Sequence, residues 1–503
     1  MKVGRLWGVR LGKEVPEHVI DFLSGRDVRS LPPCDEVLIP YDIWGSKAHT
    51  IMLWKQEIIS EQDCQEILRG LKEVEVLYHR GVFKLEASKE DVHSNIESHL
   101  IERFGIESIG KMHTARSRND QVALDMRLFL RDQAASFVDH LTSLLETMAT
   151  RARRHLGAVM PGFTHHQHAM LTTFGHMLTG LAMPLERDLV RFMNWYGLFN
   201  RNPLGGAAGY GTAFALDREL TSRLLAFDGP HDHSTDPITN RWEPETDLAF
   251  AITMTMDHLS TIAQTFILMS TTEFRMIQLD DAHSNGSSIM PQKRNPGTLE
   301  VIKAKASVAQ GILASLIAIG KGTMVGYNKD SQWTKYLIMD LVSECTPVLP
   351  VMGEIIQLME INEPAMETQA RKGFTAATHL VESILKHSNL PFRQGKALVE
   401  RAVRSAEEAG REEVGLTDLN AAMNELGLRL RLNAGDIARW QDPLKVVEGQ
   451  RAFGGPAPSA TQRSISGLTK RLRRYRKWWK DQSLRIRASQ EEIESIERDF
   501  GIE

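Results

Sequence analysis

Long stretches of the chain repeat their apolar side chains at steps of three and four, the period of an α-helix. The spacing predicts long helices over residues 121–156, 171–199, 246–277, 299–319 and 337–359. Several of them are apolar on nearly every face, and such helices are buried within a large bundle or between subunits. Patterns typical of strands are rare. The sequence therefore predicts an all-α protein with a long central helical bundle.

The pattern changes near both ends of the chain. Residues 1–45 are rich in proline and read as irregular structure with short elements, and after residues 370–373 the amphipathic segments become shorter. We expect an N-terminal mainly helical domain over 1–117, a central long-helix bundle over 118–368 and a small helical C-terminal domain over 369–503. A length of 503 residues suits two or three domains.

Composition narrows the class of protein. Hydrophobic residues make up 42% of the chain, the net charge is -4, and the three cysteines are scattered, with neither a disulfide framework nor a zinc spacing. The sequence begins without a secretory signal, and its most apolar run, residues 312–319, is far shorter than the roughly 18 residues that span a bilayer. These features predict a cytoplasmic protein with no membrane partner.

The last predicted helix is strongly basic and carries Tyr475, Trp478 and Trp479. Basic residues interleaved with aromatics can contact nucleic acid. A solvated basic face whose tryptophans pack inward explains the same pattern, and the near-neutral charge of the whole chain favours this second reading. We therefore expect no nucleic-acid partner.

The segment Gly286–Pro296 is the most informative in the chain. Its glycine, serines and two prolines predict an ordered loop, and Pro291 and Pro296 stiffen it. Two hydroxyls, the Lys293 ammonium and the Asn295 carboxamide then lie within one short stretch. Such a set can bind a carboxylate and place an activated oxygen beside the adjacent carbon. The alternative is a polar surface loop.

Four further clusters carry polar chemistry, each with a structural alternative. Glu90–Glu97 fits helix capping or the mouth of a site. In Thr114–Gln121, Asn119 and Asp120 can cap the following helix, while two arginines beside a helix N-terminus suit a dicarboxylate. Met160–His168 holds three histidines whose spacing does not favour a metal, so Thr164 and His165 are a candidate substrate contact and acid–base group. Tyr327–Lys335 is either a polar segment that contributes to a site or an ordinary connection with solvated charges between two buried helices.

Taken together, these motifs resemble the argininosuccinate lyase family of the aspartase/fumarase superfamily, whose members release fumarate from a succinyl unit. The resemblance runs along nearly the whole chain and keeps the family's order of motifs. The Gly286–Pro296 loop is shared by the superfamily, and the string Arg116–Gln121 is more particular to this branch. Further matching segments are Asp42–His49, Asn202–Gly205, Leu216–Glu219 and Gly454–Pro458.

The resemblance implies a cofactor-independent and metal-free carbon–nitrogen lyase acting on a small N-substituted aspartate. It implies Ser287 as catalytic base and His165 as its acid–base partner. It also implies a homotetramer whose sites take residues from three subunits. The predicted substrate-binding residues are Ser46, His93, Arg118, Asn119, Thr164, Lys293, Asn295, Tyr327, Gln332 and Lys335.

The chain departs from the family pattern in three places. Ala115 replaces a usual glycine, the segment after Thr164-His165 differs and includes Met170, and Trp333 and Thr334 stand where the family tends to have Glu and Asp. The last change removes two acids where a cationic guanidinium leaving group would be felt. Argininosuccinate is the predicted substrate. The alternatives are another N-substituted aspartate, as in ethylenediamine-disuccinate lyase, and a non-catalytic, crystallin-like structural protein.

Overall fold

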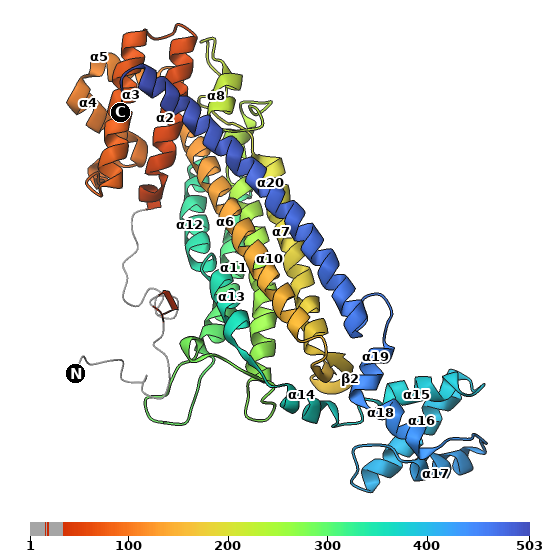
Figure 1. Ribbon diagram of the computed structural model, residues 1–503. Coiled ribbons are helices and arrows are strands. Elements are labelled where there is room, and N and C mark those ends of the chain that lie inside the picture. Colours follow the sequence, from red (N-terminus) through yellow and green to blue (C-terminus); the bar gives the residue numbers. More distant parts are fainter. Residues whose placement is uncertain (1–15, 17, 20–33, 503) are drawn as a thin grey trace.

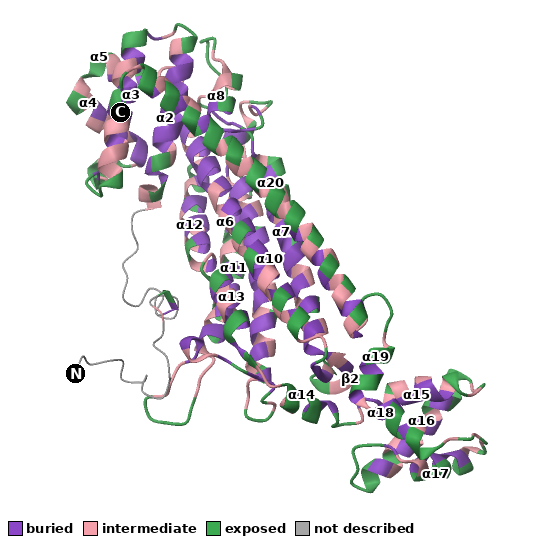
Figure 2. Cartoon of the chain, in the orientation of Figure 1, coloured by how far each residue is buried: buried purple, intermediate pink, exposed green. Residues whose placement is uncertain are grey.

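A computed structural model describes residues 16, 18, 19 and 34–502. Most of the first 33 residues of the predicted N-terminal domain therefore lie outside the described part. The described chain is mainly helical, and the predicted all-α architecture is confirmed. Figure 1 shows an elongated bundle with a group of short helices at each end. Figure 2 shows buried residues along the sides on which the long helices face one another.

The first group of helices lies at one end of the bundle (Figure 1). The predicted irregular structure up to residue 45 is wrong from Ile39 onward, because a helix starts there with Pro40 in its first turn, where no backbone donor is needed. The next helix starts with a capping box in which Ser60 and Asp63 bind each other's backbone N–H. These elements are η1 (Cys34–Leu38), α2 (Ile39–Lys55), α3 (Glu61–His79), η2 (Ala87–Lys89), α4 (Val92–Phe104), α5 (Ile106–Ile109) and η3 (Gly110–His113).

The central bundle is built from long helices joined by smaller elements. The predicted helix over 337–359 is in fact two helices, because the chain breaks at Thr346 and Pro347. The predicted helix over 246–277 ends early, at Met269. The long helices are α6 (Arg118–Arg154), α7 (Phe174–Phe199), α10 (Glu243–Met269), α11 (Gly297–Gly320), α12 (Trp333–Cys345) and α13 (Val348–Leu358). The smaller elements are α8 (Arg218–Leu224), α9 (Asp236–Thr239), β3 (Ile277–Gln278), η4 (Asp281–His283), η5 (Lys329–Gln332), β4 (Glu360–Ile361) and α14 (Glu363–Ala370).

A β-hairpin precedes α7, where the sequence predicted helix from residue 171. Strands β1 (Val159–Thr164) and β2 (Gln167–Thr173) pair antiparallel, with an irregularity between Pro161 and Phe163. The helix α7 begins only at Phe174, and the Thr173 side chain accepts the backbone N–H of His176 as its cap. The second small sheet pairs β3 with β4.

The C-terminal region adds a small helical unit and one long helix. The unit has an apolar core separate from the bundle core, which includes Leu380, Ile384, Leu398 and Trp440. Figure 1 shows this unit at the end of the bundle opposite to α2–α5. Its helices and their neighbours are α15 (Ala377–Lys386), α16 (Phe392–Glu408), α17 (Leu416–Leu426), α18 (Ala434–Gln441), α19 (Pro443–Gly449) and α20 (Pro458–Asp499).

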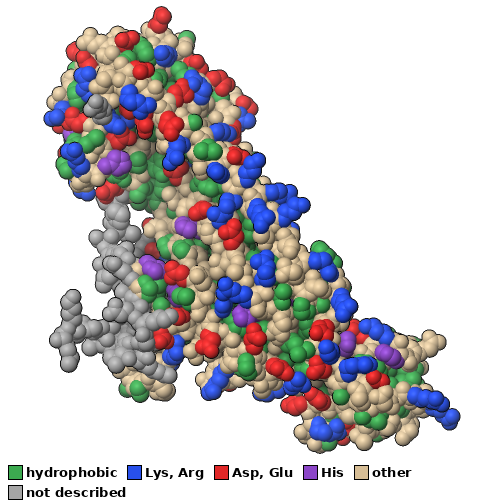
Figure 3. All heavy atoms as spheres, in the orientation of Figure 1, with side chains coloured by type: hydrophobic (Ala, Val, Ile, Leu, Met, Phe, Trp, Pro, Cys, Tyr) green, Lys and Arg blue, Asp and Glu red, His purple; other side chains and the backbone are tan. Residues whose placement is uncertain are grey.

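Helix α20 runs back along the bundle, and Figure 3 shows lysine and arginine side chains along its outer face. Trp478 and Trp479 contact the ring of Tyr196 on α7, with centroids 5.3 and 6.3 Å apart. Arg471 of α20 pairs with Glu186 of α7. The prediction that the tryptophans pack inward below a basic face is confirmed.

Two helical segments, Gly297–Gly320 and Lys329–Leu358, are long and apolar enough to cross a membrane by length and composition alone. The second is interrupted between α12 and α13. Core helices of a large bundle have the same length and composition, so this feature is weak support for a membrane span.

Candidate active site

The start of α6 carries the predicted substrate-binding turn. Ser117 caps the helix, and the Ser117 N–H donates to the Asp120 carboxylate at 2.9 Å, so the predicted capping role of Asp120 is confirmed and that of Asn119 is wrong. The second Asp120 oxygen accepts the N–H groups of Gly205 and Ala207. Burial raises the pKa of Asp120 to about 6. The backbone of the turn is thus held from two sides.

Arg118 is held by the first turn of α4. Its guanidinium donates to the Ser94 hydroxyl at 2.6 Å and to the Asp91 carboxylate at 3.3 Å, and it also faces Glu90. Asp91 caps α4 by accepting the Ser94 N–H, which confirms the capping reading of this cluster. The Arg118 side chain is half exposed, so a substrate carboxylate can reach it.

Ser46 lies below this turn on α2. Its hydroxyl accepts a hydrogen bond from Arg116 at 3.0 Å, and both side chains are buried. His49, also on α2, bonds the Thr114 carbonyl at 2.9 Å. Between these anchors Ala115 has a φ of 61°, the left-handed region that glycine adopts most readily. The usual glycine of the family at this position therefore has a conformational reason.

A buried polar trio joins α2, α4 and α6. The His93 Nδ1 lies 3.0 Å from Asp42 and 3.5 Å from Asp125, and Gln121 donates to Asp42 at 2.6 Å. Burial would raise the pKa of Asp42, but His93, Arg116 and Gln121 hold it below its ordinary value.

The third member of the trio behaves differently. Burial and the neighbouring Asp42 raise the pKa of Asp125 well above its ordinary value. Neither Asp125 oxygen has a hydrogen-bond partner among the described residues. The nearest donor atoms of Asp42, His93 and Asp125 lie within 4.8 Å of one another, a spacing that also occurs in metal sites.

The start of α12 supplies the other predicted residues at this end. Lys335 is buried and pairs with Asp35, and the guanidinium of Arg241 lies 5.2 Å from the ring centre of Tyr327. Gln332 is half-buried in the turn before α12. Lys335 lies at the same end of α6 as Asn119, because its charge acts on Asp125. Lys335 and Arg241, the partner of Tyr327, both act on the buried Glu245.

The two residues that depart from the family pattern in α12 differ in their surroundings. Trp333 is 63% exposed and packs on Tyr336, whereas Thr334 is fully buried. The Thr334 hydroxyl donates to the Ser331 carbonyl at 2.7 Å and faces the buried carboxyl of Glu245. Burial raises the pKa of Glu245 to about 7. Of the two side chains, only that of Trp333 is open to solvent.

Thr164 and His165 lie at the tip of the β1–β2 hairpin. The turn consists of His165 and His166, whose φ values of 53° and 60° are those of a type I′ turn. Both histidines are exposed. Left-handed φ at two non-glycine residues is strained, and such strain is common at functional sites. The structure therefore presents Thr164 and His165 at the tip of a β-hairpin, which the sequence did not predict.

The Gly286–Pro296 segment is an ordered loop, as predicted. Asn285 and Asn295 close its base through two backbone hydrogen bonds of 2.9 and 2.7 Å. The Ser287 Oγ accepts the Met290 N–H at 3.0 Å. Lys293 is exposed, and with Asn295 it lines a cavity of about 1000 Å³.

The base of the loop is tightly packed at Gly297, because a Cβ there would lie 2.0 Å from the side-chain oxygen of Asn285, which would have to shift. The Asn295 amide donates to the Gly286 carbonyl at 3.2 Å, directly before Ser287. Packing and hydrogen bonding therefore fix the ends of the loop. Its middle, from Ser288 to Lys293, is exposed.

The predicted residues form two groups within one chain, which we call the amino-end cluster and the carboxyl-end cluster after the ends of α6. Helix α6 has 37 residues and spans about 55 Å at 1.5 Å per residue. Arg151 near its last turn donates to the Met359 carbonyl, beside the sheet that precedes the Ser287 loop. The amino-end cluster contains Ser46, His93, Arg118, Asn119, Tyr327, Gln332 and Lys335. The carboxyl-end cluster contains Thr164, His165, Ser287, Lys293 and Asn295.

Sequence reasoning missed Asp42, Asp125 and Glu245. A signal was present, because Gln121 and Asp125 are polar residues one turn apart in a helix whose inward positions are mostly apolar. A buried acid in such a stripe needs a partner, and the partners come from α2 and α4, which the pattern of one helix does not reveal.

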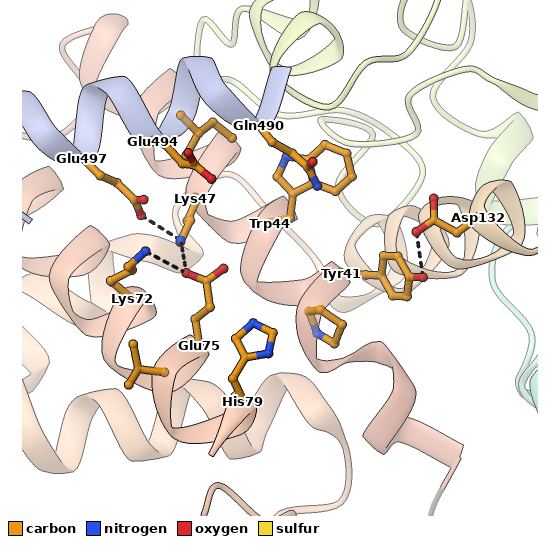
Figure 4. A pocket seen from close by; sticks show the side chains of 13 residues that line it. Tyr41, Trp44, Lys47, Lys72, Glu75, His79, Asp132, Gln490, Glu494 and Glu497 are labelled. Carbon is orange, nitrogen blue, oxygen red and sulfur yellow. Dashed lines mark hydrogen bonds and ion pairs between the residues drawn. The ribbon is translucent and has the colours of Figure 1, made fainter. Parts of the chain in front are cut away.

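A separate cavity of about 560 Å³ lies between α2, α3 and α20 (Figure 4). Its charged side chains already pair with one another: Lys47 binds Glu75 and Glu497, and Tyr41 donates to Asp132. None of the predicted site residues lines it. The candidate active site therefore lies in the two clusters at the ends of α6.

Known proteins place the chain in a family. A sequence model of the Lyase family matches residues 34–311. The chain is 36% identical to the argininosuccinate lyase of Methanococcoides burtonii over 463 residues, which cover 92% of each protein. It is 37% identical to the argininosuccinate lyase of Pelotomaculum thermopropionicum, with 93% of this chain and 99% of that protein covered.

Solved structures agree. The crystal structure of EDDS lyase in complex with formate superposes with a TM-score of 0.87 at 27% identity, covering 98% of this chain and 97% of that one. A variant of EDDS lyase with bound fumarate gives the same TM-score at 26% identity, with the same coverage. The chain belongs to the argininosuccinate lyase family and is a carbon–nitrogen lyase.

Proposed function

We propose that the protein cleaves argininosuccinate to arginine and fumarate by β-elimination, without a cofactor. The observation that carries this proposal is the Ser287 loop, whose base is closed by Asn285 and Asn295 and which holds a serine oxygen and the Lys293 and Asn295 side chains in a short ordered segment. Both relatives compared above, at 36% and 37% identity, are argininosuccinate lyases.

The proposed base is Ser287. The reaction removes a weakly acidic proton from the carbon next to a carboxylate, and a serine hydroxyl is a poor base in water. Ser287 must therefore lose its own proton to solvent before the reaction and act as an alkoxide, which becomes a hydroxyl when it takes the substrate proton. The Met290 N–H donates to the Ser287 Oγ and stabilises this alkoxide, as backbone donors do in oxyanion holes. Closure of the exposed middle of the loop over the substrate would exclude water and strengthen this effect.

The intermediate carries two negative charges on its carboxylate. Lys293 is the proposed cationic donor to it, and Asn295 the proposed neutral donor. The leaving nitrogen then takes a proton from His165 or from a group that His165 orders. Arg118 and Asn119, from the amino-end cluster, are proposed to hold the other carboxylate of the succinyl unit through bidentate and amide hydrogen bonds.

We propose that the site is composite and that the protein is a homotetramer. The two clusters lie at opposite ends of a helix about 55 Å long, so one small substrate cannot contact both within one chain. Apolar side chains on the outer faces of α10 and α11 are also exposed in the single chain, including Phe250, Leu268, Val308 and Ile317. Contact between copies would bury these side chains and bring opposite ends together.

Mixed tetramers test this arrangement. Ser287→Ala and Asn119→Ala variants are each expected to be inactive, and unfolding and refolding them together should restore part of the activity, because some sites then receive both native residues. The matched control mixes Ser287→Ala with Lys293→Ala, which lie in the same loop and should give no restoration. Restoration in the control, or none in the first mixture, would contradict a composite site. Light scattering measures the oligomeric state directly.

A second candidate is a lyase acting on another N-substituted aspartate. Two observations favour it: the EDDS lyase structures superpose closely, and Trp333 presents an exposed indole where the family tends to have an acid. An indole offers an apolar face and one donor, which suits a less charged amine than a guanidinium.

The absorbance of released fumarate separates the two candidates. The enzyme is assayed with argininosuccinate, aspartate and ethylenediamine disuccinate, each with native protein and with Trp333→Glu. A native preference for argininosuccinate supports the first candidate. A native preference for the diamine substrate that Trp333→Glu reverses supports the second. No fumarate from any substrate would favour a structural, crystallin-like role.

We also propose a cytoplasmic location. Cys34, Cys64 and Cys345 are all free thiols, which suits a reducing compartment. Cell fractionation with an antibody to the native protein tests this assignment, and recovery in the membrane pellet after a high-salt wash would contradict it.

A further inference from the structure

We propose that Asp42, His93 and Asp125 form a one-proton cluster that fixes the Arg118–Asn119 turn, with Asp125 as a positioning residue acting through His93. This inference rests on the proposed lyase function, since the turn is its proposed substrate-binding element. It assigns His93 a positioning role in addition to, or in place of, the substrate contact that the family resemblance implies.

The first step is the geometry of the junction. The trio joins three helices directly below the turn, because Asp42 is on α2, His93 is in the first turn of α4, and Asp125 is in the second turn of α6. Asp42 accepts from Gln121 of α6 and lies 3.0 Å from His93 of α4. The Asp42 carboxylate therefore links α6, which begins with the substrate-binding turn, to α4, whose first turn holds Arg118.

The second step leads from His93 to the substrate-binding turn. His93 lies between two residues that act on Arg118: Asp91 caps α4 and binds the guanidinium, and Ser94 accepts from it at 2.6 Å. A shift of the His93 ring moves the first turn of α4, and Arg118 moves with it. Asp125, at 3.5 Å from the His93 Nδ1, limits that shift from the α6 side.

The third step is charge. Asp42, His93 and Asp125 are 2%, 4% and 0% exposed, so any net charge on them must be balanced nearby. Two ionised carboxylates beside a neutral imidazole would leave two negative charges against the one positive charge of Arg116. One additional proton on the trio makes the cluster electroneutral. The trio then titrates as a unit.

The surroundings of the trio agree with a single extra proton. The raised pKa of Asp125 reflects burial first and Asp42 second. Asp35 and Lys335 pair with each other and so nearly cancel. The charged and titratable groups that face the trio are Arg116 and His113 before α6, Asp35 on η1 and Lys335 on α12. His49 on α2 faces Arg116 and His113.

Two variants test the proposal through the pH dependence of KM. As pH rises, the native trio loses its proton, the buried site gains a negative charge, and KM for the succinyl substrate rises. Asp125→Asn keeps the shape without the titration, so its KM should match the native value where the native KM is lowest and stay flat as pH rises. Asp125→Ala removes the side chain and should raise KM roughly tenfold with little change in kcat. Native protein and both variants are assayed as full-length enzyme.

The control is Asp132→Asn. Asp132 lies on the same helix, is largely buried, and has a raised pKa because of burial, but it binds Tyr41 beside the separate cavity. Its variant should show the native KM at every pH. A native-like alkaline rise of KM in Asp125→Asn would overturn the proposal, as would equal losses in Asp125→Asn and Asp125→Ala. A stoichiometric divalent metal in native protein that Asp125→Asn lacks would also overturn it.

Thermal or urea unfolding distinguishes failure of this proposal from failure of the proposed function. The folded-state pKa of Asp125 is raised, so its contribution to stability is present below its ordinary 3.8 and is lost as pH rises toward the folded value. The stability of Asp125→Asn relative to native protein should therefore grow with pH. If the stability of Asp125→Asn relative to native protein grows with pH, but the native protein releases no fumarate, the shared proton is supported and the proposed lyase activity is rejected. A difference that does not change with pH would overturn the cluster.

Discussion

The two ends of α6 carry the two halves of the proposed site in different physical states. At the amino end the functional turn is enclosed: Arg116 and Ser46 are buried and paired, and Asp120 holds both the helix start and a neighbouring loop. At the carboxyl end Thr164, His165 and Lys293 are exposed, and two histidines of the hairpin have strained backbone conformations.

The difference separates two tasks. At the amino end, buried charged groups hold the turn in one conformation without substrate, as expected for groups that bind an unreactive carboxylate. The carboxyl end keeps its reactive groups accessible and its loop free to close, as expected for groups that act on the reacting carbon. Changes at the carboxyl end should therefore alter turnover with little effect on folding, and changes at the amino end should alter stability.

The largest expected effect is at Ser287. Ser287→Ala should lower kcat by a factor on the order of 10³ or more, because it removes the proposed base. The free energy of unfolding should change little, since the Ser287 hydroxyl accepts only local N–H groups in an exposed loop. Steady-state fumarate release and urea unfolding measure the two quantities.

The adjacent Ser288 is a matched control for Ser287. It is an exposed serine of the same loop, and Ser288→Ala should retain most of the turnover. Equal losses in the two variants would show that the loop needs both hydroxyls for its conformation and would weaken the assignment of Ser287 as base.

At the amino end, acidic substitutions at the two positions that depart from the family pattern should differ in their effect on stability. Thr334→Asp places a carboxylate in a fully buried position that faces Glu245, and it should lower the free energy of unfolding by on the order of 3 kcal/mol. Trp333→Glu changes an exposed side chain and should leave stability nearly unaltered. Equal stability of both variants in urea would contradict the contrast between these neighbours.

The pH dependence of stability tests the buried charge of the amino end. Burial raises the pKa of Glu245 from its ordinary 4.5 to about 7, so the stability that Glu245 contributes is present below pH 4.5 and lost as pH rises to about 7. That rise corresponds to about 3 kcal/mol. Glu245→Gln should therefore gain about 3 kcal/mol relative to native protein between pH 4 and pH 8.

Unfolding in urea at several pH values measures this gain. Glu354 is on α13 and has a third of its side chain exposed, so Glu354→Gln serves as the control that removes a carboxyl outside this buried group. A Glu245→Gln variant whose stability relative to native protein is the same at pH 4 and pH 8 would show that Arg241 and Arg127 fully compensate the buried carboxyl.

The sequence predicted the bundle well because apolar periodicity is a local signal that long helices repeat many times. It failed where the signal is short or depends on partners. The break at Pro347 divides an apolar run that continues on both sides, and the hairpin at Thr164 is too short for a clear alternating pattern.

The ordered loop over Gly286–Pro296 was predictable because its chemistry is concentrated in one segment, and its part in a site stays a prediction. The site was not predictable where partners come from distant segments. The buried acids Asp42 and Asp125 are 83 positions apart, counted from their residue numbers, and nothing local links them. The family resemblance supplied the roles of single residues, but only the fold shows that the two clusters lie at opposite ends of one helix.

The smallest expected effect concerns Ala115, a strained residue beside the substrate-binding turn. Ala115 has a φ of 61°, which places its Cβ against its own carbonyl and costs about 1 kcal/mol relative to glycine. Ala115→Gly should therefore raise the free energy of unfolding by somewhat less than this, because glycine also gains entropy in the unfolded chain. Ala226 has a similar φ of 57° far from the turn, and Ala226→Gly should give the same stability change. The two variants should differ in kinetics: if the strain helps to hold Arg116 and Arg118, only Ala115→Gly raises KM. An equal KM in both would mean that the anchors at Ser46 and Ser94 fix the turn without help from the alanine.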